Sequence, residues 1–242
     1  MTTLINSAIP KNLQLFNKNI HSNIPNAIAN LSRSPEIQRL SKLVENNLYH
    51  DHENVLDHVQ VVFANIQEFL KFEFVKSSEL QKKYLDYFNE IPDKKGEYKR
   101  IDLLILTACL HDIGKGLKKE NGRPCLEIID EQGNTLAFGH EYLGALIVPS
   151  LLRNNYGLTP KEISIVQFLV GFHDTFNEKF CKTYLTKNTA KDIPVIQERQ
   201  PLFYIELLLH ILSDNSGFEP YQQWSDYFKN EIFQVESFLK YE

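Results

Sequence analysis

The chain has 242 residues, of which 43% are hydrophobic, enough for one large domain with a substantial buried core. Its 31 acidic and 26 basic residues leave a net charge of −5, which argues against an extended nucleic-acid-binding face. Three widely spaced cysteines without a CxxC pair, and the lack of any 18-residue apolar stretch, predict a cytoplasmic protein with reduced thiols and no membrane span.

We expect residues 1–34, which are rich in Asn, to form an irregular leader packed on the domain surface. Residues 35–242 are predicted to be a single domain, because neither an internal repeat nor a low-complexity linker interrupts them. Helical spacing begins after Ser34-Pro35, a serine cap followed by proline at the first helical position. It predicts helices over 36–49, 53–75, much of 77–98, and 100–112.

The pattern changes over residues 125–138. Two short apolar runs flank the polar segment 130–134, which has Gly133 and Asn134 in its turn, and this predicts a small β-hairpin. Farther along, the spacing predicts helices over 139–155, 160–173, 201–214 and 220–240, with an irregular segment over 186–200. The expected fold class is therefore all-α, a helical bundle with one small β-hairpin.

The most informative motif is His-Asp-Ile-Gly-Lys at 111–115, which follows the apolar run 101–110. An imidazole and a carboxylate side by side at the end of a buried helix suit a divalent metal. The carboxylate can bridge two ions, while the neutral imidazole binds one. Lys115, three residues after Asp112, is placed to meet an anion beside the metal, although a solvated lysine in a basic run is the alternative.

Further His and Asp residues occur where such a site would need them. A lone histidine in an apolar helix is more often a satisfied core side chain than a ligand. Buried charge, however, is costly unless it is paired or bound to a metal. One shared metal cluster would satisfy several apolar helices at once, and its candidate ligands are His58, His111, Asp112, His140, His173 and Asp214.

In this order the residues resemble the H…HD…H…H…D signature of the HD superfamily of metal-dependent phosphohydrolases, over about two-thirds of the chain. The segments 54–58, 111–115 and 139–145 are similar to those of the HD domains linked to bacterial tRNA nucleotidyltransferases. The resemblance implies an HD-domain bundle and a substrate phosphate held by Lys115. It implies two metal sites that share Asp112: His58, His111, Asp112 and Asp214 at the first, and Asp112, His140 and His173 at the second.

The chain also departs from the family pattern. The long interval between His58 and His111 indicates an insertion at about 77–98. The doublet is not followed by the Glu-Asp of alarmone hydrolases, and no Gly-Tyr-Pro follows as in the cyclic-di-GMP enzymes. Neither substrate is therefore favoured.

The expected function is divalent-metal-dependent hydrolysis of a phosphomonoester or phosphodiester, such as a nucleotide or a cyclic phosphate. Asp112 and Lys115 are the expected catalytic residues, at a centre of one or two Mn, Fe, Co, Ni or Mg ions. Glu141 and His52 are weaker candidates for substrate contacts, and His52 suits a surface position as well. A di-iron oxygenase of the HD fold and a nucleotide-binding sensor without turnover remain as alternatives. The oligomeric state is not predicted.

Overall fold

The computed structural model describes residues 23–153 and 156–240. Within them lie eleven α-helices: α1 (Ile24–Leu31), α2 (Pro35–Leu40), α3 (Val55–Phe69), α4 (Ser78–Phe88), α5 (Arg100–Leu110), α6 (His140–Leu152), α7 (Pro160–Phe172), α8 (Glu178–Tyr184), α9 (Thr189–Arg199), α10 (Tyr204–Asp214) and α11 (Glu219–Asn230). The described residues also contain two antiparallel strand pairs: β1 (Val44–Glu45) with β2 (Glu53–Asn54), and β3 (Glu127–Ile128) with β4 (Thr135–Leu136). The predicted all-α class and the hairpin over 125–138 are confirmed.

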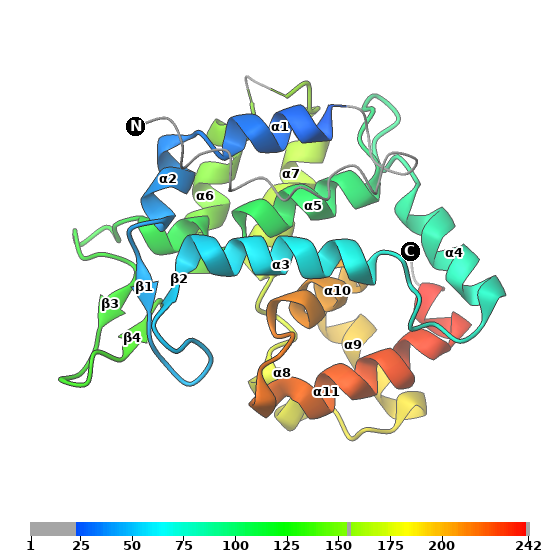
Figure 1. Cartoon of the computed structure of the whole chain (residues 1–242). Helices are drawn as coiled ribbons and strands as arrows, with labels where there is room; N and C mark the ends of the chain where they lie inside the picture. The colour runs from blue at the N-terminus through cyan, green and yellow to red at the C-terminus, as the bar shows by residue number, and fades with distance from the viewer. Residues whose placement is uncertain (1–22, 154–155, 241–242) are drawn as a thin grey trace.

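The helices α3 and α5 lie side by side through the middle of the molecule (Figure 1). Helix α1 packs against α5 on one side of this pair, and α10 packs against α3 on the other. Helix α7 also packs against α5, and α6 runs along α7. The two strand pairs lie together at one end of α3, where a backbone hydrogen bond joins Thr135 to Asn46 (Figure 1). This end of the bundle is therefore where loops and helix ends meet.

Two helices run through the core with every side buried. In α10 all residues from Tyr204 to Ser213 are buried, and in α5 all residues from Ile101 to Ala108 are. A helix that is buried around its whole circumference must be surrounded by other elements, as these two are. Helices α5 and α10 therefore bring His111, Asp112 and Asp214 to one end of the bundle.

The predicted helix starts at Ser34 and Thr159 are confirmed. The Ser34 hydroxyl accepts a hydrogen bond from the Ile37 backbone N–H, which caps α2. At the start of α7, Thr159 and Glu162 form a capping box in which each side chain accepts from the other's backbone N–H. Local cap chemistry therefore located both helix starts from sequence.

The N-terminal expectation is wrong in part. Residues 24–31, assigned to an irregular leader, form α1, and the remaining leader residues 1–22 lie outside the described part of the chain. The buried residues of α1 are Ile24, Ala27, Ile28 and Leu31, the spacing of one helical face. This segment is therefore part of the core.

The helix expected over 36–49 is wrong beyond Leu40, where α2 ends. Farther along, an Asx turn forms, in which the Asn47 side-chain oxygen accepts hydrogen bonds from the backbone N–H groups of Tyr49 and His50. That turn joins β1 to β2, a strand pair that was not predicted. The error matters, because this loop lines the candidate site.

Two further differences concern the second half of the chain. Residues 186–200, expected to be irregular, contain α9, and α8 was not predicted either. The Asp192 carboxylate accepts hydrogen bonds from the backbone N–H groups of Thr186 and Asn188, which holds the chain at the start of α9 despite Pro194 inside the helix. The last predicted helix ends at Asn230, and short 3-10 turns follow.

After α5 the chain makes a 3-10 turn (Ile113–Gly116) that packs against the start of α6. A Cβ atom on Gly114 would lie 1.8 Å from the His140 carbonyl oxygen and 2.8 Å from the Gly144 backbone nitrogen. Because both neighbours are backbone atoms, glycine is the residue that fits. The close approach holds Asp112 beside the first residue of α6.

We predict that Gly114→Ala lowers the free energy of unfolding by about 1–3 kcal/mol, because the added methyl group forces the turn away from α6. Urea unfolding followed by circular dichroism measures the loss. Gly171→Ala is the control, since a Cβ there meets only the Ala145 Cβ, at 3.3 Å. Equal stability of the two variants would contradict the packing argument.

Candidate metal centre

All six predicted ligands lie at helix ends that converge. His58 is in the first turn of α3, and His140 is the first residue of α6. The other four lie at C-terminal ends: His111 and Asp112 directly after α5, His173 after α7, and Asp214 as the last residue of α10. The C-terminal end of a helix carries a partial negative charge, so three of these helices favour a cation where they meet.

Three of the histidines are held in the same way. The Nδ1 atoms of His111, His140 and His173 lie 2.8 to 2.9 Å from the backbone carbonyl oxygen three residues earlier in the chain. A carbonyl oxygen can only accept, so Nδ1 carries the proton and Nε2 presents its lone pair. This is how protein histidines are prepared to bind a metal through Nε2.

The Nε2 atoms of His140 and His173 face each other at 3.2 Å. With both Nδ1 atoms donating to carbonyls, neither neutral ring has a hydrogen to place between them. The Nε2 atom of His111 is buried and has no hydrogen-bond partner among the described residues. Buried acceptors of this kind are costly unless a proton or a cation lies between them.

Asp112 lies between these histidines, and its side chain is almost fully buried. Its Oδ1 is 3.2 Å from His140 Nε2, and its Oδ2 is 3.3 Å from His111 Nε2 and 3.8 Å from His58 Nε2. Two groups close enough to hold a metal ion share this carboxylate: His58, His111 and Asp112, and Asp112, His140 and His173. Buried His and Asp groups can therefore hold a metal ion here.

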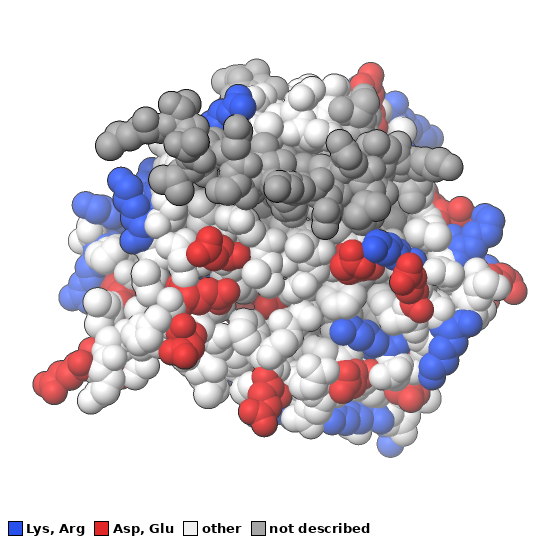
Figure 2. Space-filling model, viewed as in Figure 1, with Lys and Arg blue, Asp and Glu red and all other residues white. Residues whose placement is uncertain are grey.

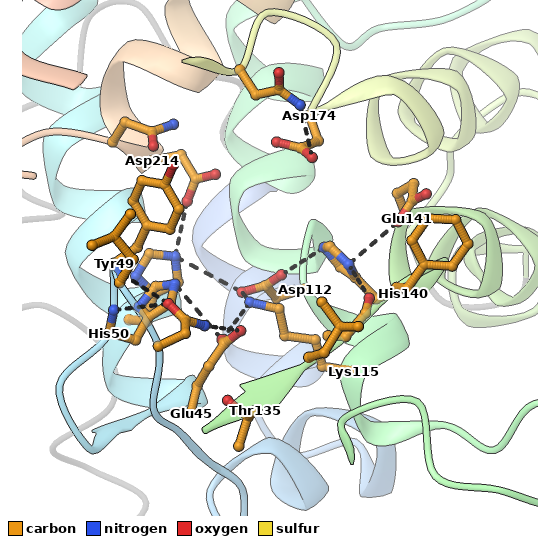
Figure 3. Close-up of a pocket in the computed structure, with 18 of the residues that line it drawn as sticks. Glu45, Tyr49, His50, Asp112, Lys115, Thr135, His140, Glu141, Asp174 and Asp214 are labelled. Atoms are coloured by element: carbon orange, nitrogen blue, oxygen red, sulfur yellow. Dashed lines mark hydrogen bonds and ion pairs between the residues drawn. The ribbon is translucent and has the colours of Figure 1, made fainter. Parts of the chain in front are cut away.

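Asp214, the last residue of α10, lies beside the first of these groups (Figure 3). Its Oδ1 lies 2.8 Å from His58 Nε2 and 3.6 Å from His111 Nε2. The structure thus brings all six predicted ligands together, although up to 156 residues separate them in the chain.

The acidic members of the site are held ionised. Burial alone would raise the pKa of Asp112, but the charged Lys115 ammonium beside it acts in the opposite direction, and the pKa lies well below its usual range. Burial also acts against the charge on Asp214, yet its hydrogen bond to His58 lowers the pKa of the carboxyl. Both carboxylates are therefore available as anionic ligands.

The imidazoles divide into two kinds. Burial, together with His140 and His111, lowers the pKa of His173 well below its usual value, so this ring is neutral. Burial opposes charge on His140 as well, but its contact with Asp112 raises the pKa. His210 packs behind the site against His111 and His173, and burial lowers its pKa to about 3. A neutral ring leaves its lone pair for a cation.

Lys115 lies inside the site rather than in solvent. Its Nζ is 2.9 Å from Asp112 Oδ2 and 2.7 Å from Glu45 Oε2, and the side chain is buried. Burial would lower the pKa of Lys115, but the Asp112 and Glu45 carboxylates raise it, so the ammonium stays charged. The expectation of a cation beside the metal ligands agrees with this placement, and Glu45 is a partner that the sequence did not reveal.

A pocket of about 500 Å³ opens over the ligands (Figure 3). Glu141, expected as a substrate contact, lines it and lies beside the His140 ring. His52, the other weak candidate, is exposed and lies outside the lining residues. His50 takes that place instead, with its side chain buried between Glu45 and Glu53.

Sequence reasoning missed Glu45 and Glu53 as parts of the site, and it did not predict that His50 is buried there. Only His50 carried a signal, because it lies eight residues before a ligand in a chain with few histidines. Glu45 contacts a lysine 70 residues away, and no local pattern reveals such a contact. Its position depends on the β1–β2 pair, which places Glu45 directly opposite Glu53.

On the face drawn in Figure 2, the described residues carry both Lys or Arg and Asp or Glu side chains. Among those residues, no helix is long and apolar enough to cross a lipid bilayer.

No protein-family model matches this chain, and a search of curated proteins gives no significant match. The assignment of a site therefore depends on the arrangement of these side chains.

We predict that Mn²⁺ at about 100 times its dissociation constant raises the free energy of unfolding by about 2.7 kcal/mol. Asp112→Ala should abolish this stabilisation, because the carboxylate shared by both groups is lost. Thermal unfolding with and without Mn²⁺ measures it. His52→Ala should behave as the unaltered chain does, and a loss of stabilisation in that control would point to metal binding elsewhere.

Proposed function

We propose that the chain is a divalent-metal-dependent phosphohydrolase of the HD type, acting as a phosphomonoesterase or phosphodiesterase on a small phosphorylated substrate such as a nucleotide or cyclic phosphate. The observation that carries the proposal is the pair of facing Nε2 atoms of His140 and His173, with Asp112 Oδ1 3.2 Å from His140 Nε2. Three acceptors this close together in a buried site are best explained by a cation between them.

The ligand set supports membership of the HD superfamily. His58, the His111-Asp112 doublet, His140, His173 and Asp214 converge in the order in which the superfamily signature has them. The set combines four imidazoles with two carboxylates, which suits Mn, Fe, Co, Ni or Mg better than a closed zinc site. When bound, one or two such ions lower the pKa of a coordinated water and offset charge on the phosphoryl group.

The chain's own residues orient and neutralise the reacting group. Asp112, as the shared carboxylate, sets the position of a cation relative to both histidine groups. Lys115 lines the pocket with its ammonium 2.9 Å from Asp112 Oδ2, so it can donate to a phosphoryl oxygen beside the cations. Phe218 packs against the His58 and His50 rings and shields this end of the site from water.

The pocket mouth supports a small substrate with an aromatic part. Leu48, Leu136 and Phe138 line it, although their side chains are between 53% and 78% exposed. Apolar side chains held out in solvent at the edge of a pocket commonly contact a ligand. Phe138 is placed to pack against a nucleobase while the phosphate lies at Asp112 and Lys115.

The proposed activity predicts hydrolysis of p-nitrophenyl phosphate or its bis ester in the presence of Mn²⁺, Ni²⁺ or Co²⁺. Release of p-nitrophenol, followed by phosphate release from a panel of nucleotides and cyclic phosphates, measures it, and Lys115→Ala should lower the rate. No turnover with any of these ions across the panel would contradict the proposal.

Two other results would support the alternative functions. Iron retained on purification, with substrate-dependent oxygen uptake, would support the oxygenase. Nucleotide affinity without turnover would support the sensor.

Phe138→Ser should raise the KM for a nucleoside monophosphate by about 10-fold, because stacking on a base contributes about 1–3 kcal/mol. The KM for a phosphate ester without an aromatic group should stay nearly constant. Ile128→Ser is a matched control, since Ile128 is as exposed on the same hairpin but does not line the pocket. Equal effects of the two substitutions would remove the base-contact argument.

A further inference from the structure

His58 is held differently from the other histidines of the site. The Nδ1 atoms of His111, His140 and His173 face backbone carbonyls, whereas His58 Nδ1 faces a carboxylate, Glu53 Oε2, at 3.6 Å. The opposite nitrogen, His58 Nε2, points to Asp214 and Asp112. A carboxylate on the outer nitrogen makes a metal-binding imidazole a stronger ligand than a neutral acceptor does.

We propose that Glu53, held in place by His50, is a positioning residue that fixes the orientation of His58 as a metal ligand. The inference rests on the proposed metal centre. Glu53 acts through His58, so its effect falls on metal affinity first and on catalysis only as a result.

The local fold places Glu53 for this role. Glu53 belongs to β2, and the next residue, Asn54, caps α3 by accepting hydrogen bonds from the backbone N–H groups of Leu56 and Asp57. The chain thus enters α3 with a fixed direction, and His58 follows within the first turn. The carboxylate before the cap and the imidazole after it therefore face each other.

His50 fixes the carboxylate from the other side. Its Nδ1 lies 2.6 Å from Glu53 Oε2, and its Nε2 lies 3.7 Å from Glu45 Oε2. The His50 ring also packs edge-on against the His58 ring, with centroids 4.7 Å apart. The Asx turn at Asn47 holds the His50 backbone, and the contacts with Glu53 and His58 hold its ring.

The contacts continue around the site to the other side of the same ligand group. Glu45, the register partner of Glu53, accepts a hydrogen bond from Lys115, which in turn pairs with Asp112 (Figure 3). Each buried charge in this series has a partner of opposite charge or a polar neighbour, as buried ionic groups require. The carboxylates of β1 and β2 thus support both sides of the first predicted metal site.

His50, Glu53 and His58 could also hold a cation themselves, because one ligand atom of each lies within 4.8 Å of the others. We favour the positioning role, because the 2.6 Å contact between His50 and Glu53 is a hydrogen-bond distance and His58 Nε2 is already directed to Asp214. The two interpretations predict different metal stoichiometries.

The test compares Mn²⁺ binding to the unaltered chain, Glu53→Gln and Asp57→Asn by isothermal titration calorimetry. Glu53→Gln should weaken the affinity by about 10-fold at unchanged stoichiometry, as loss of such outer partners does. Asp57→Asn removes an exposed carboxylate next to His58 in the sequence and should leave the affinity unchanged. Co²⁺ absorption spectra should shift for Glu53→Gln alone, since the His58 ligand is reoriented.

His50→Gln provides a second route. It should weaken Mn²⁺ binding less than Glu53→Gln does, and the double variant should be no weaker than Glu53→Gln alone, because His50 acts through Glu53. Unchanged Mn²⁺ affinity in Glu53→Gln would overturn the proposal. Loss of one metal equivalent would overturn it in favour of a cation site at His50, Glu53 and His58. If the unaltered chain binds no metal, the proposed function fails as well.

Discussion

The arrangement depends on one buried carboxylate. Asp112 lies within 3.8 Å of imidazole nitrogens from three different helices and 2.9 Å from the Lys115 ammonium. A carboxylate in such a place is stable only while these groups stay close, since removing it from water costs several kcal/mol. The packing of Gly114 on the His140 backbone is what brings α5 and α6 near enough to meet this need.

The helices contribute to both the core and the candidate site: their bodies form the core, and their ends carry the candidate ligands. Helices α5 and α10 are buried along almost their whole length, and they end at His111, Asp112 and Asp214. Polar side chains at helix ends can face a common space without breaking the apolar packing along the helix bodies. Three helix C-termini then add partial negative charge where a cation would lie. The rigid bundle thus holds the candidate ligands, and the loops of the two strand pairs form the pocket wall around them.

Part of the fold could be predicted from the sequence, because the signals that specify it lie in neighbouring residues. Helical spacing and caps predicted most helix bodies, and the polar segment 130–134 predicted the β3–β4 hairpin. The short α2 and the β1–β2 pair could not be predicted in the same way, because the apolar spacing of 36–49 does not reveal the strand pairing and the Asx turn that follow Leu40. The α9 helix was missed, although the Asp192 contacts that hold its start are made to residues four and six positions earlier in the chain.

The sequence by itself determined which helices end in His or Asp and in what order, because apolar spacing and ligand chemistry are properties of neighbouring residues. Only the tertiary structure decided that Lys115 pairs with Glu45, that His50 rather than His52 enters the site, and that Glu53 faces His58. These contacts depend on strand register and on the direction in which a loop enters a helix. The pairing of Glu45 with Glu53 and the cap at Asn54 involve residues close in the chain, but neither follows from a periodic pattern in the sequence. The Lys115–Glu45 contact joins residues 70 positions apart, which only the packed fold brings together.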